Sequence, residues 1–343
     1  MALLATLGFV TACHADISIK GAGATYPSRV YERWTKRFAE LNPGLAVSYS
    51  PTGSGDGIKQ IKARAVQFGG TDNPLTAKQL SDNHLVQIPM LVGGLVPVIN
   101  VPSVGGNQLV LSGRVLADIM RGDVPRWDDA RIAALNPSVK LPALAVARIV
   151  REDASGSTEI WLRYLAASSA PFAAAVPVSQ KPVWPGMPMA AKGNDGVAAL
   201  LKATPGGITY VSYDRVLKDK LIGVRLIGHA GAPIAASEDA FRAAITASDM
   251  YKKGDDEASL LRMPQPGAWP VTATSFMLLD ATPKDFASTE WAARFVYWCF
   301  MHGDELTQHT GFAPLPSRVQ ARLAGRLLQV RGPSGQMPAF MGR

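Results

Sequence analysis

The chain has 343 residues, of which 47% are hydrophobic and 18% charged, a balance typical of a folded globular protein and unlike that of a disordered one. Lysine and arginine outnumber aspartate and glutamate by 35 to 27, and the resulting net charge of +8 favours an anionic partner. The basic residues form no cluster with interleaved aromatic residues, so this charge does not indicate nucleic-acid binding.

The first fifteen residues have the pattern of an export leader. Ala2 to Ala12 are almost wholly apolar, the run is too short to span a bilayer, and small residues follow around Cys13 and Ala15. The basic segment that usually precedes such a run is missing. Because Val10-Thr11-Ala12-Cys13 also resembles a lipobox, two outcomes stay open: cleavage after Ala15, or lipid attachment at Cys13. Both predict an exported protein.

Strand and helix signals alternate along the rest of the chain, which predicts an α/β fold. Apolar residues at helical spacing predict a helix over 28–41, ended by Pro43-Gly44. The elements expected after it are a strand over 45–49, a helix opening at 58–61, strands over 66–70 and 95–100, a helix capped by Ser112 and ended by Gly122, a strand over 145–150 and a helix opening at 155–158. Cys299 lies in an apolar helical run, 295–300, so we expect a buried core cysteine and not a nucleophile.

Three loops of similar composition precede predicted helices: Gly21–Pro27, Thr52–Gly57 and Arg151–Thr158. Each places small residues and hydroxyls where the N–H groups of a helix start lack intrahelical partners, and such a terminus attracts anions. Any one loop alone is typical of an ordinary helix cap. The three together, with the bidentate donor Arg151, predict a site for an oxyanion.

Asp72 narrows the choice of anion. A carboxylate repels a bound anion unless that anion carries a proton that the carboxylate can accept. Phosphate is protonated near neutral pH and sulfate is not, so Asp72 in the site would admit phosphate and reject sulfate. The alternative is that Thr71-Asp72-Asn73-Pro74 forms a turn with a helix cap.

The chain resembles the phosphate-specific substrate-binding proteins of bacterial ABC importers from about Ile17 to its C-terminus. The matching segments are Gly21-Ala22-Gly23-Ala24-Thr25-Tyr26-Pro27, Gly53-Ser54-Gly55, Phe68-Gly69-Gly70-Thr71-Asp72, Arg151-Glu152-Asp153-Ala154-Ser155-Gly156-Ser157, Lys192-Gly193-Asn194-Asp195-Gly196, Gly207-Ile208-Thr209-Tyr210-Val211 and Ala268-Trp269-Pro270-Val271-Thr272. The resemblance implies a two-lobed periplasmic-binding-protein fold of type II, with phosphate in a cleft between α/β lobes joined by hinge strands. Residues 16–100 and 270–343 would form lobe I and residues 101–269 lobe II, with chain crossings near Asn100 and Trp269.

The resemblance also implies a role for each site residue. The ligand-binding set is Thr25, Tyr26 (through its backbone N–H), Ser54 and Asp72 from lobe I, and Arg151, Ser155, Gly156 and Ser157 from lobe II. Asp153 would orient Arg151. Asp56 is an extra carboxylate at the opening of the second helix: pointing into the cleft it would weaken anion binding, and pointing to solvent it would be a favourable first-turn acid.

The implied partners are inorganic phosphate and the membrane permease subunits of the importer, together with their ATPase subunit. The implied protein is a periplasmic monomer, lipid-anchored through Cys13 where the lipobox is used, with no cofactor, metal or nucleic acid.

Three other functions compete with phosphate binding. Catalysis by Ser54, Ser155 or Ser157 would need a general base, but none of the five histidines adjoins these loops in sequence, and no P-loop, dinucleotide fingerprint or zinc spacing is present. A binder of sulfate or molybdate would share the helix termini, and Asp72 argues against it. An adhesion protein on the same scaffold would keep the site residues only loosely.

Overall fold

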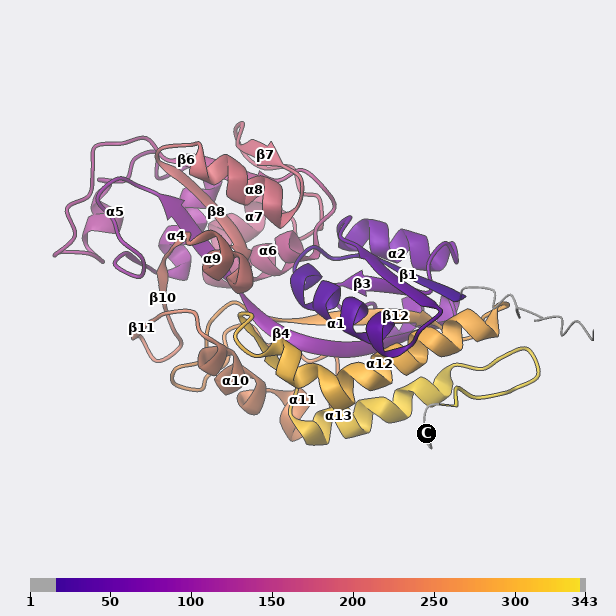
Figure 1. Ribbon diagram of the computed structural model, residues 1–343. Helices are drawn as coiled ribbons and strands as arrows, with labels where there is room; N and C mark the ends of the chain where they lie inside the picture. Colours follow the sequence, from indigo (N-terminus) through magenta and orange to yellow (C-terminus); the bar gives the residue numbers. More distant parts are fainter. Residues whose placement is uncertain (1–16, 340–343) are drawn as a thin grey trace, which may run out of the picture.

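The computed structural model describes residues 17–339, so the predicted leader, with Cys13 and Ala15, lies outside the described residues. Two lobes lie side by side (Figure 1). Lobe I contains β1, β2, β3, β12 and β13 with α1, α2, α12 and α13, and lobe II contains β6, β7 and β8 with α4 to α9. The predicted α/β class and its division into two lobes are confirmed.

The strands are β1 (Ile17–Gly23), β2 (Leu45–Ser50), β3 (Phe68–Thr71), β4 (Leu85–Asn100), β5 (Val110–Leu111), β6 (Ala147–Arg151), β7 (Met189–Ala191), β8 (Gly207–Ser212), β9 (Ile222–Gly223), β10 (Arg225–Ile227), β11 (Pro233–Ile234), β12 (Thr272–Asp280) and β13 (Phe312–Pro314). The helices are α1 (Ser28–Leu41), α2 (Ser54–Lys62), α3 (Ala77–Asp82), α4 (Gly113–Arg121), α5 (Ala130–Ala133), α6 (Gly156–Ser168), α7 (Ala170–Ala175), α8 (Gly193–Lys202), α9 (Tyr213–Asp219), α10 (Glu238–Ala247), α11 (Asp249–Lys252), α12 (Phe286–Thr307) and α13 (Ser317–Ala324), followed by the 3₁₀ helix η1 (Gly325–Gln329).

Strand β4 belongs to both lobes. Its first part pairs antiparallel with β12 as far as Gly94, and its second part, from Leu95, pairs with β8 of lobe II. The sheet order β2-β1-β3-β12-β4-β8-β6-β7 is therefore continuous from one lobe to the other. The strand expected over 95–100 is only the C-terminal part of this longer strand. The pairing partner of β4 changes earlier in the chain than Asn100, where the first crossing was expected.

Helices α10 and α11 lie within the range expected for lobe II, yet they pack against lobe I. Helix α10 contacts β13, and the guanidinium of Arg318 on α13 lies 4.0 Å from the centre of the Tyr251 ring on α11. Arg322 of α13 also forms an ion pair with Asp256, just after α11. In the small sheet β11-β10-β5, strand β11 is the last strand before this segment.

Local sequence explains where the first helices begin and end. Helix α1 has the predicted bounds because Val30, Tyr31, Trp34 and Phe38 are buried on one face. Helix α2 begins at Ser54, earlier than expected at Ile58, because most of the glycine-rich stretch adopts helical backbone.

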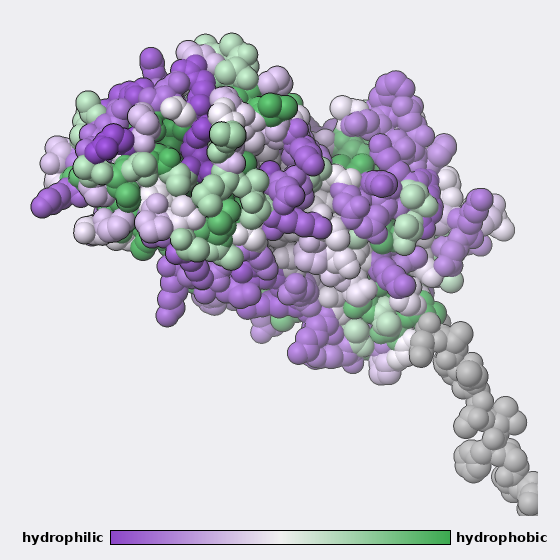
Figure 2. Space-filling model, turned by 90° about the horizontal axis from the view of Figure 1, so that it is seen from above, coloured by the Kyte–Doolittle hydropathy of each residue, from purple (hydrophilic) through white to green (hydrophobic). Residues whose placement is uncertain are grey.

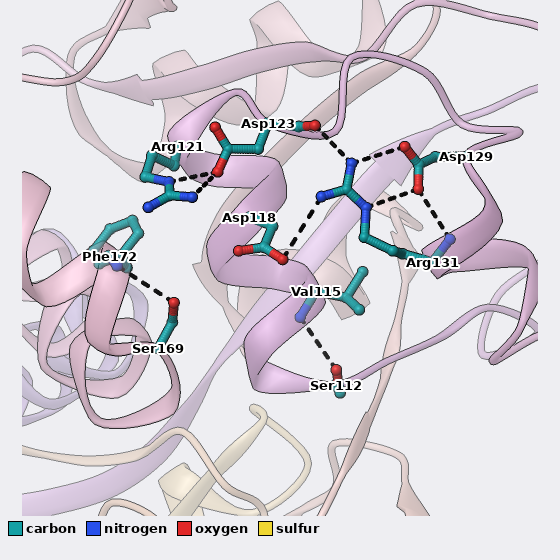
Figure 3. A network of polar contacts seen from close by, with 9 residues as sticks. All are labelled: Ser112, Val115, Asp118, Arg121, Asp123, Asp129, Arg131, Ser169 and Phe172. Atoms are coloured by element: carbon teal, nitrogen blue, oxygen red, sulfur yellow. Dashed lines mark hydrogen bonds and ion pairs between the residues drawn. The ribbon is translucent and has the colours of Figure 1, made fainter.

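Helix α4 of lobe II is held by a cap at each end and by a polar network (Figure 3). The Ser112 hydroxyl accepts a hydrogen bond from the Val115 N–H, and Gly122 ends the helix in the left-handed conformation at φ 98°. Arg131 donates to the Asp129 carboxylate and to the Asp123 carbonyl, and its Nη1 forms an ion pair with Asp118 of α4 at 3.8 Å, which ties the segment after α4 back to the helix. Both predicted ends of α4 are confirmed.

Helix α12 packs along α1 and against the sheet of lobe I, and Cys299 is buried within it, as expected for a core cysteine. Within residues 17–339, no helix combines the length and the apolar character needed to cross a membrane. In the space-filling view the outline of the molecule is indented where the two lobes meet (Figure 2).

Candidate functional site

The three predicted anion-binding loops meet where the lobes touch. The backbone at Gly55 and Ala154 forms one contact, in which the Gly55 N–H of lobe I donates to the Ala154 carbonyl of lobe II at 3.1 Å. A second crosses from Asn73, whose side-chain amide donates to the Gly156 carbonyl at 2.8 Å. The structure is therefore a closed form, with the lobes in direct contact around the predicted site.

Four predicted site residues form one buried cluster at this contact: Ser54 and Asp72 of lobe I, and Gly156 and Ser157 of lobe II. The Ser157 hydroxyl donates to Asp72 Oδ2 at 3.1 Å, and the Asp72 N–H donates to Ser54 Oγ at 3.3 Å. The side chains of Ser54, Asp72 and Ser157 are each at most 3% exposed, so water does not compete for these contacts.

Two glycines are required by the close approach of the lobes. Gly53 has a φ of 105°, which favours glycine, and a Cβ atom there would lie 2.7 Å from Asp153 Oδ2. Gly156 has ordinary backbone geometry, but an added Cβ would lie 2.5 Å from Ser54 Oγ and 2.9 Å from Asp72 Cβ. Larger residues at either position would hold the lobes apart.

Arg151 is buried at the end of β6 and paired with Asp153. Its Nε donates to Asp153 Oδ1 at 2.8 Å, and its Nη2 bonds the other carboxylate oxygen. The Gly193 N–H also donates to Asp153 Oδ1, at 2.9 Å. The Nη1 group of Arg151 donates to no other described residue, so the guanidinium is held in a fixed plane with hydrogens left for a ligand.

The first loop contributes backbone and hydroxyl groups. The Tyr26 ring is buried in the core of lobe I, edge-on to Phe312 with ring centroids 5.0 Å apart, so its side chain is part of the core. Thr25 is half-buried, and its Oγ1 accepts a hydrogen bond from the Asn194 amide of lobe II at 2.9 Å.

The hydroxyls of Thr25, Ser54 and Ser155 are left as donors. Each oxygen accepts a hydrogen bond from an N–H group, which for Ser155 is that of Thr158 at 3.2 Å. A hydroxyl that accepts in this way keeps its own hydrogen to donate. The N–H groups of Gly156 and Ser157, the first residues of α6, also lack intrahelical partners. Such a set of donors suits an anion.

Asp72 is the acceptor beside these donors. Its Oδ1 is buried and has no hydrogen-bond partner among residues 17–339. Burial raises the pKa of Asp72 to about 7, while the Ser157 hydroxyl and the Arg151 charge act in the opposite direction. The unpartnered oxygen can accept one proton-bearing group of a ligand.

Asp56 is turned to its own helix. Its carboxylate accepts a hydrogen bond from the Gln60 side chain, one turn along α2, at 2.5 Å. It makes no hydrogen bond to the Asp72 cluster among the described residues, and it lies in the first turn of α2 where an acid is favourable.

Sequence reasoning missed Asn73, Gln180 and Asn194. Asn73 and Asn194 make hydrogen bonds between the lobes, and the carbonyl of Gln180 accepts from the Ser155 N–H at 2.9 Å. Asn194 lies in the matched segment Lys192–Gly196, which was a usable signal. No local pattern marked Gln180.

A cavity of about 180 Å³ borders the cluster and is lined by residues of both lobes, among them Asp72, Asn73, Arg163 and Thr274. It is large enough for several water molecules. No group of three His, Cys, Asp or Glu side chains in the described part of the chain could hold a metal ion.

The comparisons with known proteins agree with this geometry. The model of a PBP superfamily domain matches residues 10–301. A phosphate-binding protein from Stenotrophomonas maltophilia has the same fold, with a TM-score of 0.68 and 16% identity over 90% of this chain and 94% of that chain. A periplasmic phosphate-binding protein solved with phosphate gives a TM-score of 0.70 at 21% identity, over 90% and 93% of the two chains. The fold is thus that of the two-lobed periplasmic binding proteins.

Relatives with curated descriptions show which family of periplasmic binding proteins the chain belongs to. The phosphate-binding protein PstS of Xylella fastidiosa is 34% identical over 88% of this chain and 82% of its own length. PstS of Haemophilus influenzae is 33% identical over 92% of this chain and 93% of its own. The chain belongs to the PstS family of phosphate-binding proteins.

Proposed function

We propose that this protein binds inorganic phosphate between its lobes and delivers it to the permease of an ABC-type phosphate importer, acting as a binding protein and not as an enzyme. The observation that carries the proposal is the buried cluster of Ser54, Asp72, Gly156 and Ser157, in which one Asp72 oxygen has no partner and the charge of the buried Arg151 acts on the carboxylate. Membership of the PstS family supports the same ligand.

In this proposal, Thr25, Ser54 and Ser155 donate through their hydroxyls, and Tyr26, Gly156 and Ser157 donate through their backbone N–H groups. Arg151, oriented by Asp153, supplies the countercharge, and Asp72 accepts the proton of the phosphate. These groups replace the water around the ion when the lobes close, and the permease would recognise the closed shape.

The lobe boundaries follow the strand pairing. We place the first crossing inside β4 at Gly94–Leu95 and the return to lobe I before α10. The protein would work as an exported monomer in the periplasm, and Cys13 would be its lipid anchor if the leader is processed at the lipobox. The mass of the mature N-terminal peptide distinguishes lipidation at Cys13 from cleavage after Ala15.

Isothermal titration of the purified protein, stripped of bound anion, tests the ligand. We expect tight one-to-one phosphate binding and little response to sulfate. Equal binding of both anions would show a general oxyanion receptor, and binding of neither would refute the proposal.

A further inference from the structure

Two neighbouring residues, Gly193 and Asn194, contact residues of the candidate site in different lobes, although neither was expected to bind the ligand. The Gly193 N–H donates to Asp153 Oδ1 at 2.9 Å, and Asp153 in turn holds Arg151. The Asn194 amide reaches across to Thr25 of lobe I. The first turn of α8 therefore contacts both Asp153, which holds Arg151 in place, and the hydroxyl donor Thr25.

The orientation of the Asn194 amide is determined by its surroundings. Asn194 is 2% exposed, and its Oδ1 accepts a hydrogen bond from the Ser212 N–H at 3.2 Å. Since the oxygen must face this N–H, the Nδ2 group faces Thr25 and can only donate to it. Thr25 Oγ1 is thus made an acceptor toward Asn194, and its hydrogen is free to point to the anion.

This contact exists only when the lobes are together, because Thr25 precedes α1 in lobe I and Asn194 lies in the first turn of α8 in lobe II. We infer that Asn194 is a positioning residue that couples lobe closure to the donor orientation of the Thr25 hydroxyl. The inference rests on the proposed function. Asn194 acts through Thr25, and it slows release of the anion by completing the site only in the closed form.

Paired variants test the inference, with phosphate as the probe and the full chain as the protein. Asn194→Ala should weaken phosphate binding by about tenfold, the loss expected for one hydrogen bond that acts on a charged ligand. The loss should lie in a faster dissociation rate, measured by stopped flow, with the association rate nearly unchanged. Asn194→Asp should bind phosphate more weakly still, because its carboxylate would accept the Thr25 hydrogen that otherwise points to the anion and would add a negative charge.

The decisive measurement is a double-mutant cycle with Thr25→Val, which removes the hydroxyl and keeps the shape of the side chain. In the Thr25→Val background, Asn194→Ala should cost much less than in the wild type, because there is no hydroxyl left to orient. A merely structural role of Asn194 would give the same loss in both backgrounds and would overturn the inference.

Asn100→Ala is the matched control. The Asn100 amide also stabilises α8, by donating to the carbonyls of Leu201 and Lys202 at 2.9 and 3.2 Å, but it lies at the opposite end of the helix from Thr25. This variant should lower the melting temperature and leave phosphate affinity unchanged. If Asn194→Ala binds phosphate with wild-type affinity, the inference is refuted and the proposed function is not affected. If the wild-type protein does not bind phosphate, the proposed function and the inference are both refuted.

Discussion

Replacing Gly156 by alanine should prevent full closure of the lobes. The added Cβ would lie 2.9 Å from Asp72 Cβ and 2.5 Å from Ser54 Oγ. Non-bonded carbon atoms settle at about 3.5–4.0 Å, so the lobes would have to separate by roughly half an ångström or more. Such a separation lengthens the hydrogen bonds from Asn73 to the Gly156 carbonyl, now 2.8 Å, and from Ser157 to Asp72, now 3.1 Å.

Losing these two bonds, at about 1 to 1.5 kcal/mol each, should weaken phosphate binding by roughly 30- to 150-fold. Isothermal titration measures the affinity, and small-angle scattering should show that phosphate compacts the variant less than the wild type. Gly106→Ala is the control, because a Cβ at Gly106 has no atom within 4 Å. A Gly156→Ala protein whose phosphate affinity is within about threefold of the wild type would show that the lobes tolerate the extra methyl group and that their close contact at Gly156 is not needed for binding.

Three further predictions concern the charged residues. Asp72→Asn should weaken phosphate binding and reduce the preference for phosphate over sulfate. In the wild type the same preference should shrink as the pH falls from 8 to 5, because protonated Asp72, with its pKa raised to about 7, can donate to sulfate. Competition titrations at both pH values would contradict this if the preference stayed constant. Arg151→Ala should abolish measurable binding of either anion, since it removes the buried countercharge and leaves Asp153 unpaired, and a calorimetric titration that still shows strong binding would refute that role. The closed form should lose stability as the pH rises from about 4 through 7, because its buried Asp72 keeps a proton that the unfolded chain releases. Melting temperatures of Asp72→Asn should therefore depend less on pH over this range than those of the wild type.

Local signals were sufficient to predict the starts of α1, α4 and α6 and to mark the three loops that meet at the candidate site. Ser112 and Gly122 bound α4 through their own side chain and backbone, and the apolar spacing of α1 is complete within the helix itself. The loops before α1, α2 and α6 were recognisable because a helix start has the same chemical needs in any fold.

Contacts that depend on lobe closure could not be predicted in the same way. Thr25 and Asn194 are 169 positions apart, and the approach of Asn73 to the Gly156 carbonyl exists only because the lobes meet there. The change of partner inside β4 was hidden for a related reason. A strand that is buried along almost its whole length has one continuous apolar pattern, which does not reveal which neighbour it pairs with.

The place of β12 in the sheet has a consequence for how the chain is made. This strand, from the last quarter of the sequence, lies between β3 and β4 and pairs with both. Until the ribosome has synthesised Thr272–Asp280, the strand edges of β3 and β4 that pair with β12 have no partner, and the sheet of lobe I lacks its central strand. Stable folding of that lobe therefore waits until nearly the whole polypeptide has been synthesised.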